Sequence, residues 1–216
     1  MLCGYVFGYG SLVADALPLA SGLERVRPVW GALPGFRRSW TVAMRNRDRV
    51  NDVKHVVDAQ TGRRPDLWVT YVDLDRDRAT AVNGVAVPVD EDRLAVFDTR
   101  ELNYERIEVT ADFVAEPGEA WPPEREVPVW VYVGSAAGRQ RYVEGRAAGR
   151  AVIRAGYRTR LEDAFRARGQ SAWRRYQETT TPPEVETVEG LRLVRTPPRG
   201  GDRTAGSQTR SGLTAW

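Results

Sequence analysis

The chain has 216 residues, 42% of them hydrophobic and 28% charged, which is enough apolar content for one domain with a buried core. A single cysteine, Cys3, and a single histidine, His55, exclude disulfide frameworks, iron–sulfur clusters and Cys/His zinc sites, because each needs several such ligands. The formal net charge is +3, and arginines are scattered among acids with Lys54 as the one lysine, so the composition does not predict a nucleic-acid-binding face.

Short apolar runs between turn residues predict strands at residues 3–7, 29–33, 39–44, 67–74 and 85–89. An N-cap at Asp90, followed by two acids, predicts a helix from Asp90 to about Glu101. Alternating residues predict a half-buried strand at 107–113, whereas the run at 127–133 is apolar on both faces and should lie inside the sheet. Helices are predicted at residues 139–147 and 151–168. This order predicts an α+β fold with a mostly antiparallel or mixed sheet.

The last residues and the compartment can also be predicted from composition. Residues 197–216 are rich in Gly, Ser, Thr and Arg and offer few apolar side chains to offset the entropy of ordering. We therefore expect a single domain over residues 1–196 and a disordered tail over residues 197–216. The sequence has no uninterrupted apolar run of membrane-spanning length, residues 1–20 lack the basic start of a signal peptide, and cystine chemistry is missing. These features predict a cytoplasmic protein.

The first predicted strand leads into a glycine-containing loop, Gly8-Tyr9-Gly10-Ser11-Leu12. Val13 stands where a dinucleotide motif has its third glycine, and no lysine follows as in a phosphate loop. Two glycines and a serine nevertheless let a ligand approach the backbone, whose N–H groups can bind a carboxylate or an oxyanion. The alternative interpretation is an ordinary turn at the end of a strand.

Glu101 is the second candidate functional residue. On the helix that precedes it, Leu94, Phe97 and Glu101 share one face, whereas Arg93 and Arg100 fall on the opposite, solvent-facing side. Burial disfavours the charged form of a carboxylate and so suits it to proton transfer near neutral pH. The alternative is a structural ion pair between Glu101 and an arginine.

These two segments together resemble one protein family. Residues 6–12 are similar to the N-terminal YGS loop of γ-glutamylcyclotransferase-like proteins, and residues 97–101 are similar to the LDxxE segment that holds their catalytic glutamate. Their order and separation also resemble the family, with Phe97 in place of the usual leucine. The resemblance extends to Tyr132, Tyr142 and Tyr157 and covers residues 2 to about 181.

The resemblance implies a fold and a reaction. The fold would be a small mixed β-barrel or strongly curved sheet, surrounded by helices, with a cavity at one end. In the reaction, the α-amine of a γ-glutamyl group attacks its own γ-carbonyl, closes the 5-oxoproline ring and expels the amine. Glu101 would be the catalytic acid–base, without a metal or cofactor. The substrate-binding residues implied are Tyr9, Gly10, Ser11, Leu12, Tyr104, Tyr132 and Tyr142.

The expected partner is therefore a small γ-glutamyl compound, and neither a nucleic acid nor a membrane; the oligomeric state is left open. Residues 13–16 differ from the motifs of the glutathione-specific branch, so glutathione is not the first expectation. The alternative hypothesis is a non-catalytic member of the same fold that binds a small anion or a protein partner.

Overall fold

Two long antiparallel strands organise the fold. The computed structural model describes residues 1–15, 27–48, 54–121 and 127–195. In it, β2 (Val29–Arg45) pairs with β4 (Trp68–Val89) over nearly its whole length. Shifts of register near Phe36 and after Ser39 bend the pair. The four strands predicted at 29–33, 39–44, 67–74 and 85–89 are thus parts of two continuous strands, because neither residues 34–38 in β2 nor the mostly polar residues 75–80 in β4 end the strand.

The main sheet has mixed strand directions. β1 (Gly4–Gly8) pairs antiparallel with β4 and parallel with β7 (Val129–Gly134), so the interior position predicted for β7 is confirmed. β5 (Tyr104–Glu108) lies beyond β7 at one edge, and β6 (Val114–Ala115) lies beyond β2 at the other. These two edges do not pair among the described residues, so the sheet is a curved, open one and the barrel form of the expectation is wrong. The predicted α+β class is confirmed.

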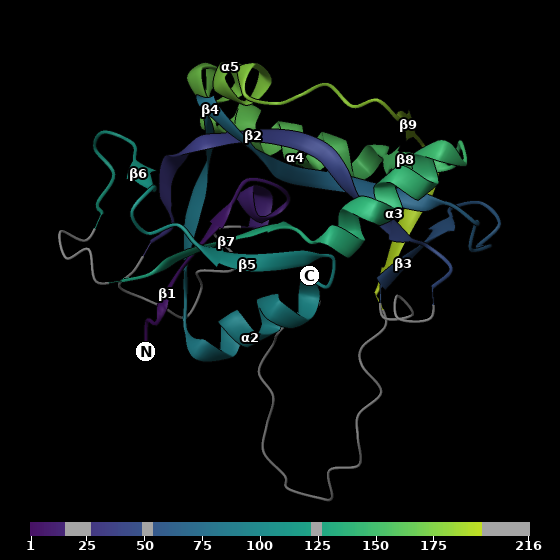
Figure 1. Ribbon diagram of the computed structural model, residues 1–216, viewed down its shortest axis with the longest axis horizontal. Helices are drawn as coiled ribbons and strands as arrows, with labels where there is room; N and C mark the ends of the chain where they lie inside the picture. The colour runs from purple at the N-terminus through teal and green to yellow at the C-terminus, as the bar shows by residue number, and fades with distance from the viewer. Residues whose placement is uncertain (16–26, 49–53, 122–126, 196–216) are drawn as a thin grey trace, which may run out of the picture.

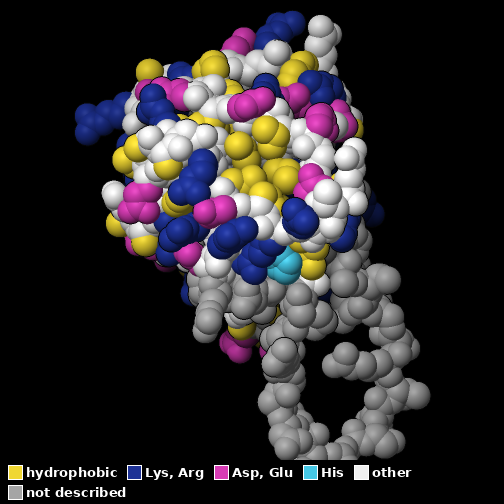
Figure 2. All heavy atoms as spheres, turned by 90° about the vertical axis from the view of Figure 1, so that its right-hand side faces the viewer, with side chains coloured by type: hydrophobic (Ala, Val, Ile, Leu, Met, Phe, Trp, Pro, Cys, Tyr) yellow, Lys and Arg dark blue, Asp and Glu magenta, His cyan; other side chains and the backbone are white. Residues whose placement is uncertain are grey.

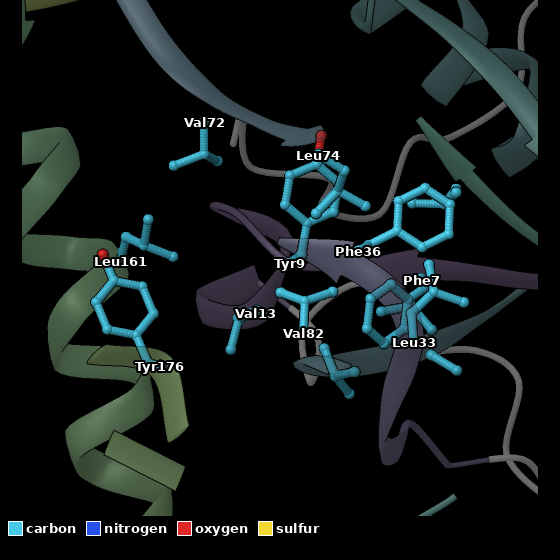
Figure 3. Packing of buried hydrophobic residues seen from close by; sticks show 14 of the residues in the cluster. Phe7, Tyr9, Val13, Leu33, Phe36, Val72, Leu74, Val82, Leu161 and Tyr176 are labelled. Atoms are coloured by element: carbon cyan, nitrogen blue, oxygen red, sulfur yellow. The ribbon is translucent and has the colours of Figure 1, made fainter. Parts of the chain in front are cut away.

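Helices cover both faces of this sheet (Figure 1). Successive side chains of a strand point to opposite faces, and accordingly Phe7 belongs to the main core while Val6 belongs to a second cluster. The main core is covered by α4 (Ala155–Arg168) and by α5 (Gln170–Glu178). The sequence patterns had not indicated α5. Leu161 and Tyr176 of these helices face the strand residues in Figure 3. On the other face, α2 (Glu91–Arg100) packs through Phe97.

The starts of two helices show how their sequences cap them. The Asp90 side chain accepts a hydrogen bond from the Arg93 N–H at 2.9 Å, so α2 begins where the N-cap was predicted. The Ser135 hydroxyl caps α3 (Ala136–Ala147) by accepting a hydrogen bond from the Gly138 N–H. The helix therefore begins three residues earlier than the one predicted at 139–147. This places α3 against β2.

Two predicted elements were wrong in part. Residues 151–154, expected as the first turn of the 151–168 helix, form β8 (Ala151–Arg154), which pairs with β4 and with β9 (Glu186–Val188). No side chain caps a helix before Ala155, and two flanking strands satisfy the backbone instead. The strand predicted at 107–113 ends at Glu108, and the N–H groups of Asp112 and Phe113 both donate to the Val109 carbonyl. This turn buries Val109 and Phe113 while exposing Ala111, so the alternation did not report a strand.

A separate two-stranded ribbon joins distant parts of the chain. It consists of β3 (Lys54–Asp58) and β10 (Leu191–Arg195) in antiparallel register. The Asn46 side chain holds it to the main sheet by bonding both the N–H and the carbonyl of Val56. His55 therefore lies on a strand.

None of the helices in the described ranges is long and apolar enough to cross a bilayer. The tail predicted to be disordered, residues 197–216, lies outside the described residues.

Candidate functional site

The glycine loop packs closely against β4. The Val13 N–H donates to the Gly10 carbonyl at 3.0 Å, so the chain coils immediately after the loop. A Cβ atom on Gly10 would lie 2.8 Å from Val72 Cγ2 and 3.4 Å from the Tyr157 hydroxyl oxygen. Any side chain at position 10 would therefore push against the sheet. Glycine is required here for close approach, and it leaves the loop backbone uncovered.

A buried arginine holds this loop through a hydrogen bond to its backbone. Arg38 is fully buried, and its Nε donates to the Tyr9 carbonyl at 2.8 Å. Its two terminal nitrogens donate to the Asn83 carbonyl and the Thr180 hydroxyl, at 2.7 and 2.8 Å. Burial lowers the Arg38 pKa to about 10, which still leaves the guanidinium charged near neutral pH. Arg38 thus links the loop to β4 and to the segment after α5.

Glu101 follows the last residue of α2, where two backbone hydrogen bonds fix it. Its N–H donates to the Phe97 carbonyl at 2.9 Å, and its carbonyl accepts from the Tyr104 N–H at 2.8 Å. The carboxylate is 16% exposed, with Oε1 3.1 Å from Nε of Arg100. The Arg100 Nε makes no hydrogen bond of good geometry, so the contact is an ion pair without an aligned N–H.

Arg100 is not on the solvent side, where the helix period placed it. Its side chain is 20% exposed, and Nη2 donates to the Ser11 hydroxyl at 3.2 Å. The prediction was wrong because the glycine loop packs against this side of the last turn of α2. Arg100 therefore joins Glu101 and the loop in one site.

Two adjoining cavities meet at Glu101. The first, which we call the tyrosine cavity, is lined by the glycine loop, by neighbouring apolar residues and by four tyrosines: Phe7, Gly8, Tyr9, Gly10, Ser11, Leu12, Val72, Glu101, Tyr104, Tyr132 and Tyr157. The second, which we call the arginine cavity, shares Ser11, Glu101, Tyr104 and Tyr157 with it. It continues past Glu101 toward the β3–β10 ribbon and is rich in charge. A ligand spanning both cavities would pass the Glu101 carboxylate.

The tyrosine hydroxyls are held by the surrounding protein. Tyr9 donates to the Tyr132 carbonyl at 2.7 Å, Tyr104 donates to the Val72 carbonyl at 2.7 Å, and Tyr132 donates to Asp98 at 2.6 Å. Burial is the main cause that raises the pKa of all three, and of Tyr157. The cavity is therefore walled by neutral, positioned phenols.

The structure brings together most of the site residues indicated by the sequence. Glu101, the loop residues Tyr9 to Leu12, Tyr104 and Tyr132 all line the tyrosine cavity. Tyr142 does not, because the buried face of α3 packs it against Ala43, Trp68 and Ala151 in a separate cluster. Tyr142 thus lines neither this cavity nor the neighbouring one.

Sequence reasoning missed the charged half of the site. The arginine cavity is lined by five cations and two acids: Lys54, Arg100, Arg154, Arg160, Arg195, Asp15 and Glu101. Figure 2 shows Lys and Arg side chains gathered beside the single histidine, which lies on β3. The lone lysine of the chain was the one available signal, since the arginines are not distinguished by any local pattern.

Lys54 is perturbed by this environment. Its pKa is lowered to about 8, mainly by burial; Glu101 raises it, and Arg100, Arg195 and Arg154 lower it. Its Nζ lies 4.9 Å from the centre of the Tyr71 ring, and burial raises the pKa of Tyr71 to about 12. Lys54 is thus the group of this cavity that changes charge just above neutral pH.

In the described ranges, no group of three or more His, Cys, Asp or Glu side chains is arranged to hold a metal ion. The two acids of the arginine cavity each form an ion pair with an arginine, Glu101 with Arg100 and Asp15 with Arg160.

Comparisons with known proteins place this chain near several solved structures. No family model and no curated protein matches it. A yeast γ-glutamyl cyclotransferase specific to glutathione is 12% identical, with a TM-score of 0.45 over 82% of this chain and 96% of that one. A structure titled γ-glutamyl cyclotransferase is 14% identical, with a TM-score of 0.37 over 67% and 79% of the two chains. An Arabidopsis thaliana protein is 23% identical, with a TM-score of 0.37 over 62% and 69%. At these identities and TM-scores the matches assign no substrate and no residue roles, which must come from the site itself.

Proposed function

We propose that this protein is an enzyme of the γ-glutamyl cyclotransferase type, which converts a γ-glutamyl compound into 5-oxoproline and a free amine. The observation that carries the proposal is the position of the Glu101 carboxylate, at the junction of two cavities and beside an uncovered glycine loop. The likeness of residues 6–12 and 97–101 to the family's motifs supports it. The predicted cytoplasmic location belongs to the same proposal.

The tyrosine cavity would take the γ-glutamyl group. Gly10 and Ser11 offer backbone and hydroxyl groups to its α-carboxylate and γ-carbonyl, with Tyr9 and Leu12 completing the loop. Tyr104 and Tyr132 also line this cavity, with their own hydroxyls already hydrogen-bonded. Fixed walls suit an intramolecular reaction, because folding the substrate so that its amine meets its own carbonyl supplies much of the rate acceleration.

Glu101 would move the proton. The substrate's ammonium group gives a proton to the carboxylate, and the neutral nitrogen then attacks the γ-carbonyl carbon to form a C–N bond. The bond from that carbon to the leaving nitrogen breaks as Glu101 returns the proton to it. The attacking nitrogen, which still carries two protons, then gives one of them to Glu101, and the carboxylate passes it to the released amine. The products are 5-oxoproline and the amine as an ammonium ion, and Glu101 is again ionised.

The test is the release of 5-oxoproline from a panel of γ-glutamyl dipeptides, γ-glutamyl amines and glutathione. Glu101→Gln keeps the size of the side chain but cannot accept the proton, so the rate should fall by about 10²- to 10⁴-fold. Glu105→Gln is the matched control, because Glu105 is exposed on β5 and lines neither cavity. Retained turnover in Glu101→Gln would refute the assigned role.

A binding protein for small anions is the second candidate, and the cations of the arginine cavity favour it. In that case Glu101 would only brace Arg100 across the 3.1 Å contact. Stability does not separate the two hypotheses, because Glu101→Gln removes the ion pair under both. Only turnover does: a binding protein would bind the panel compounds and release no 5-oxoproline.

A further inference from the structure

The arginine cavity holds cations that its own acids do not neutralise. Asp15 forms an ion pair with Arg160 and lies 3.9 Å from Nη2 of Arg100, while Glu101 contacts Arg100. Lys54, Arg154 and Arg195 line the same cavity, and none of the three has an acidic side chain within ion-pair distance among the described residues. We refer to these three residues as the cation trio.

The trio is brought together by three strands. Lys54 on β3 stands directly opposite Arg195 on β10 in the ribbon register, and Arg154 ends β8. Like charges placed opposite each other on paired strands repel and destabilise the pairing. An anion bound between them would offset that repulsion. The arrangement is therefore better suited to a bound anion than to an empty cavity.

We propose that the leaving amine of the substrate carries at least two negative charges, which the cation trio binds in the arginine cavity. This inference rests on the proposed function, which puts the γ-glutamyl group in the tyrosine cavity and the scissile bond at Glu101. The rest of the substrate must then extend along the shared wall of Ser11 and Tyr104 into the arginine cavity. Three cations that form no ion pair with an acid of the described residues exceed what a single carboxylate would neutralise.

Two kinds of amine fit this chemistry. One is a dicarboxylic amino acid, and the other is an amine that bears a phosphate group, which is close to doubly charged near neutral pH. Arginine binds both groups through paired N–H donors, so the trio does not by itself distinguish them. Substrates with a neutral amine would leave the three cations without a partner.

The experiment is calorimetric binding to Glu101→Gln protein, in which cyclisation is slow, with turnover of the parent measured in parallel. The probes are γ-glutamylethylamine, γ-glutamylalanine, γ-glutamylglutamate and γ-glutamylphosphoethanolamine, which differ in the charge of the leaving amine. We expect the doubly charged compounds to bind about tenfold or more tightly than γ-glutamylalanine, and γ-glutamylethylamine to bind most weakly. The tighter of the two doubly charged probes identifies carboxylate or phosphate as the group preferred.

Variants of the trio test its assignment. Adding Lys54→Gln or Arg195→Gln should reduce the preference for doubly charged probes by about tenfold. Adding Arg192→Gln removes the same charge from the exposed side of β10, outside both cavities, and should leave the preference unchanged. Increased salt should weaken the doubly charged probes most.

The outcomes separate this inference from the proposed function. Equal binding of γ-glutamylalanine and the doubly charged probes, no binding at all, or an equal loss of preference with Arg192→Gln would overturn the assignment of the trio. A clear preference for double charge, with no 5-oxoproline formed by the parent, would overturn the proposed function and leave the anion subsite in place.

Discussion

Replacing Arg38 by methionine should destabilise the protein although it removes a buried, unpaired charge. The substitution leaves the Tyr9 and Asn83 carbonyls, both buried, without their donor. Each unsatisfied acceptor costs about 2 kcal/mol, or about 4 kcal/mol for the pair. Loss of the cation from the faces of Phe165 and Tyr176, at 4.9 and 4.7 Å, adds about 1 kcal/mol.

A favourable contribution opposes this loss. Burial lowers the pKa of Arg38 from 12.5 to about 10, which corresponds to a free-energy cost of about 3 kcal/mol for keeping the buried guanidinium charged. Methionine removes that cost, so the net loss in the free energy of unfolding is about 2 kcal/mol. For a chain of this length, the melting temperature should fall by about 4–8 °C.

The assay is urea unfolding, with Arg37→Met as the matched control. Arg37 is the preceding residue on β2, but its side chain is 32% exposed, and it pairs with Asp77 at 2.8 Å near the surface. An exposed pair of this kind contributes about 1 kcal/mol or less. If Arg38→Met lost no more stability than Arg37→Met, the view that Arg38 holds the glycine loop and β4 together would be refuted.

Two further substitutions address the loop and the lysine. Gly10→Ala should lower the free energy of unfolding by about 1–3 kcal/mol, because the added Cβ would lie 2.8 Å from Val72 Cγ2. When Val72→Ala is added, the loss in the double variant should be smaller than the sum of the two single losses, and simple additivity in urea unfolding would contradict the clash. The pKa of Lys54, about 8 when folded against 10.5 when unfolded, means that the folded state carries the cost of a buried cation below pH 8 and loses that cost as pH rises toward 10.5. Lys54→Met should therefore be more stable than the parent below pH 8, and the difference should shrink by about 1.4 kcal/mol per pH unit from there to pH 10.5; a difference independent of pH would contradict the assigned shift.

Patterns in the sequence indicated the tyrosine cavity because local chemistry determines most of it. The apolar run before Gly8 predicted β1 and its loop, and the Asp90 cap fixed the phase of α2 and so the position of Glu101. Tyr142 shows where this stops. Helix periodicity says that a residue is buried, but which neighbour covers it depends on the packing of α3 on β2.

Apart from the lone lysine, no feature of the sequence indicated the arginine cavity. Lys54, Arg154 and Arg195 belong to three short strands whose pairing joins distant parts of the chain. In a chain with 32 lysines and arginines, the gathering of five of them in one cavity follows from tertiary structure alone. The sequence also did not predict the ribbon. Val56 and Val57 are adjacent buried residues, so β3 shows no alternation of buried and exposed positions.

The β3–β10 ribbon separates most of the cation trio from the part of the site that holds Glu101, a separation that selection or engineering could use. The glycine loop and Glu101 are attached to the main sheet and α2, whereas two of the three trio cations sit on the ribbon, outside the hydrogen-bonding pattern of that sheet. Residues on the ribbon can therefore be exchanged without disturbing the Arg38 network or the α2 cap. Under the proposed function, the choice of leaving amine would be free to diverge among relatives while the cyclising half of the site stays the same.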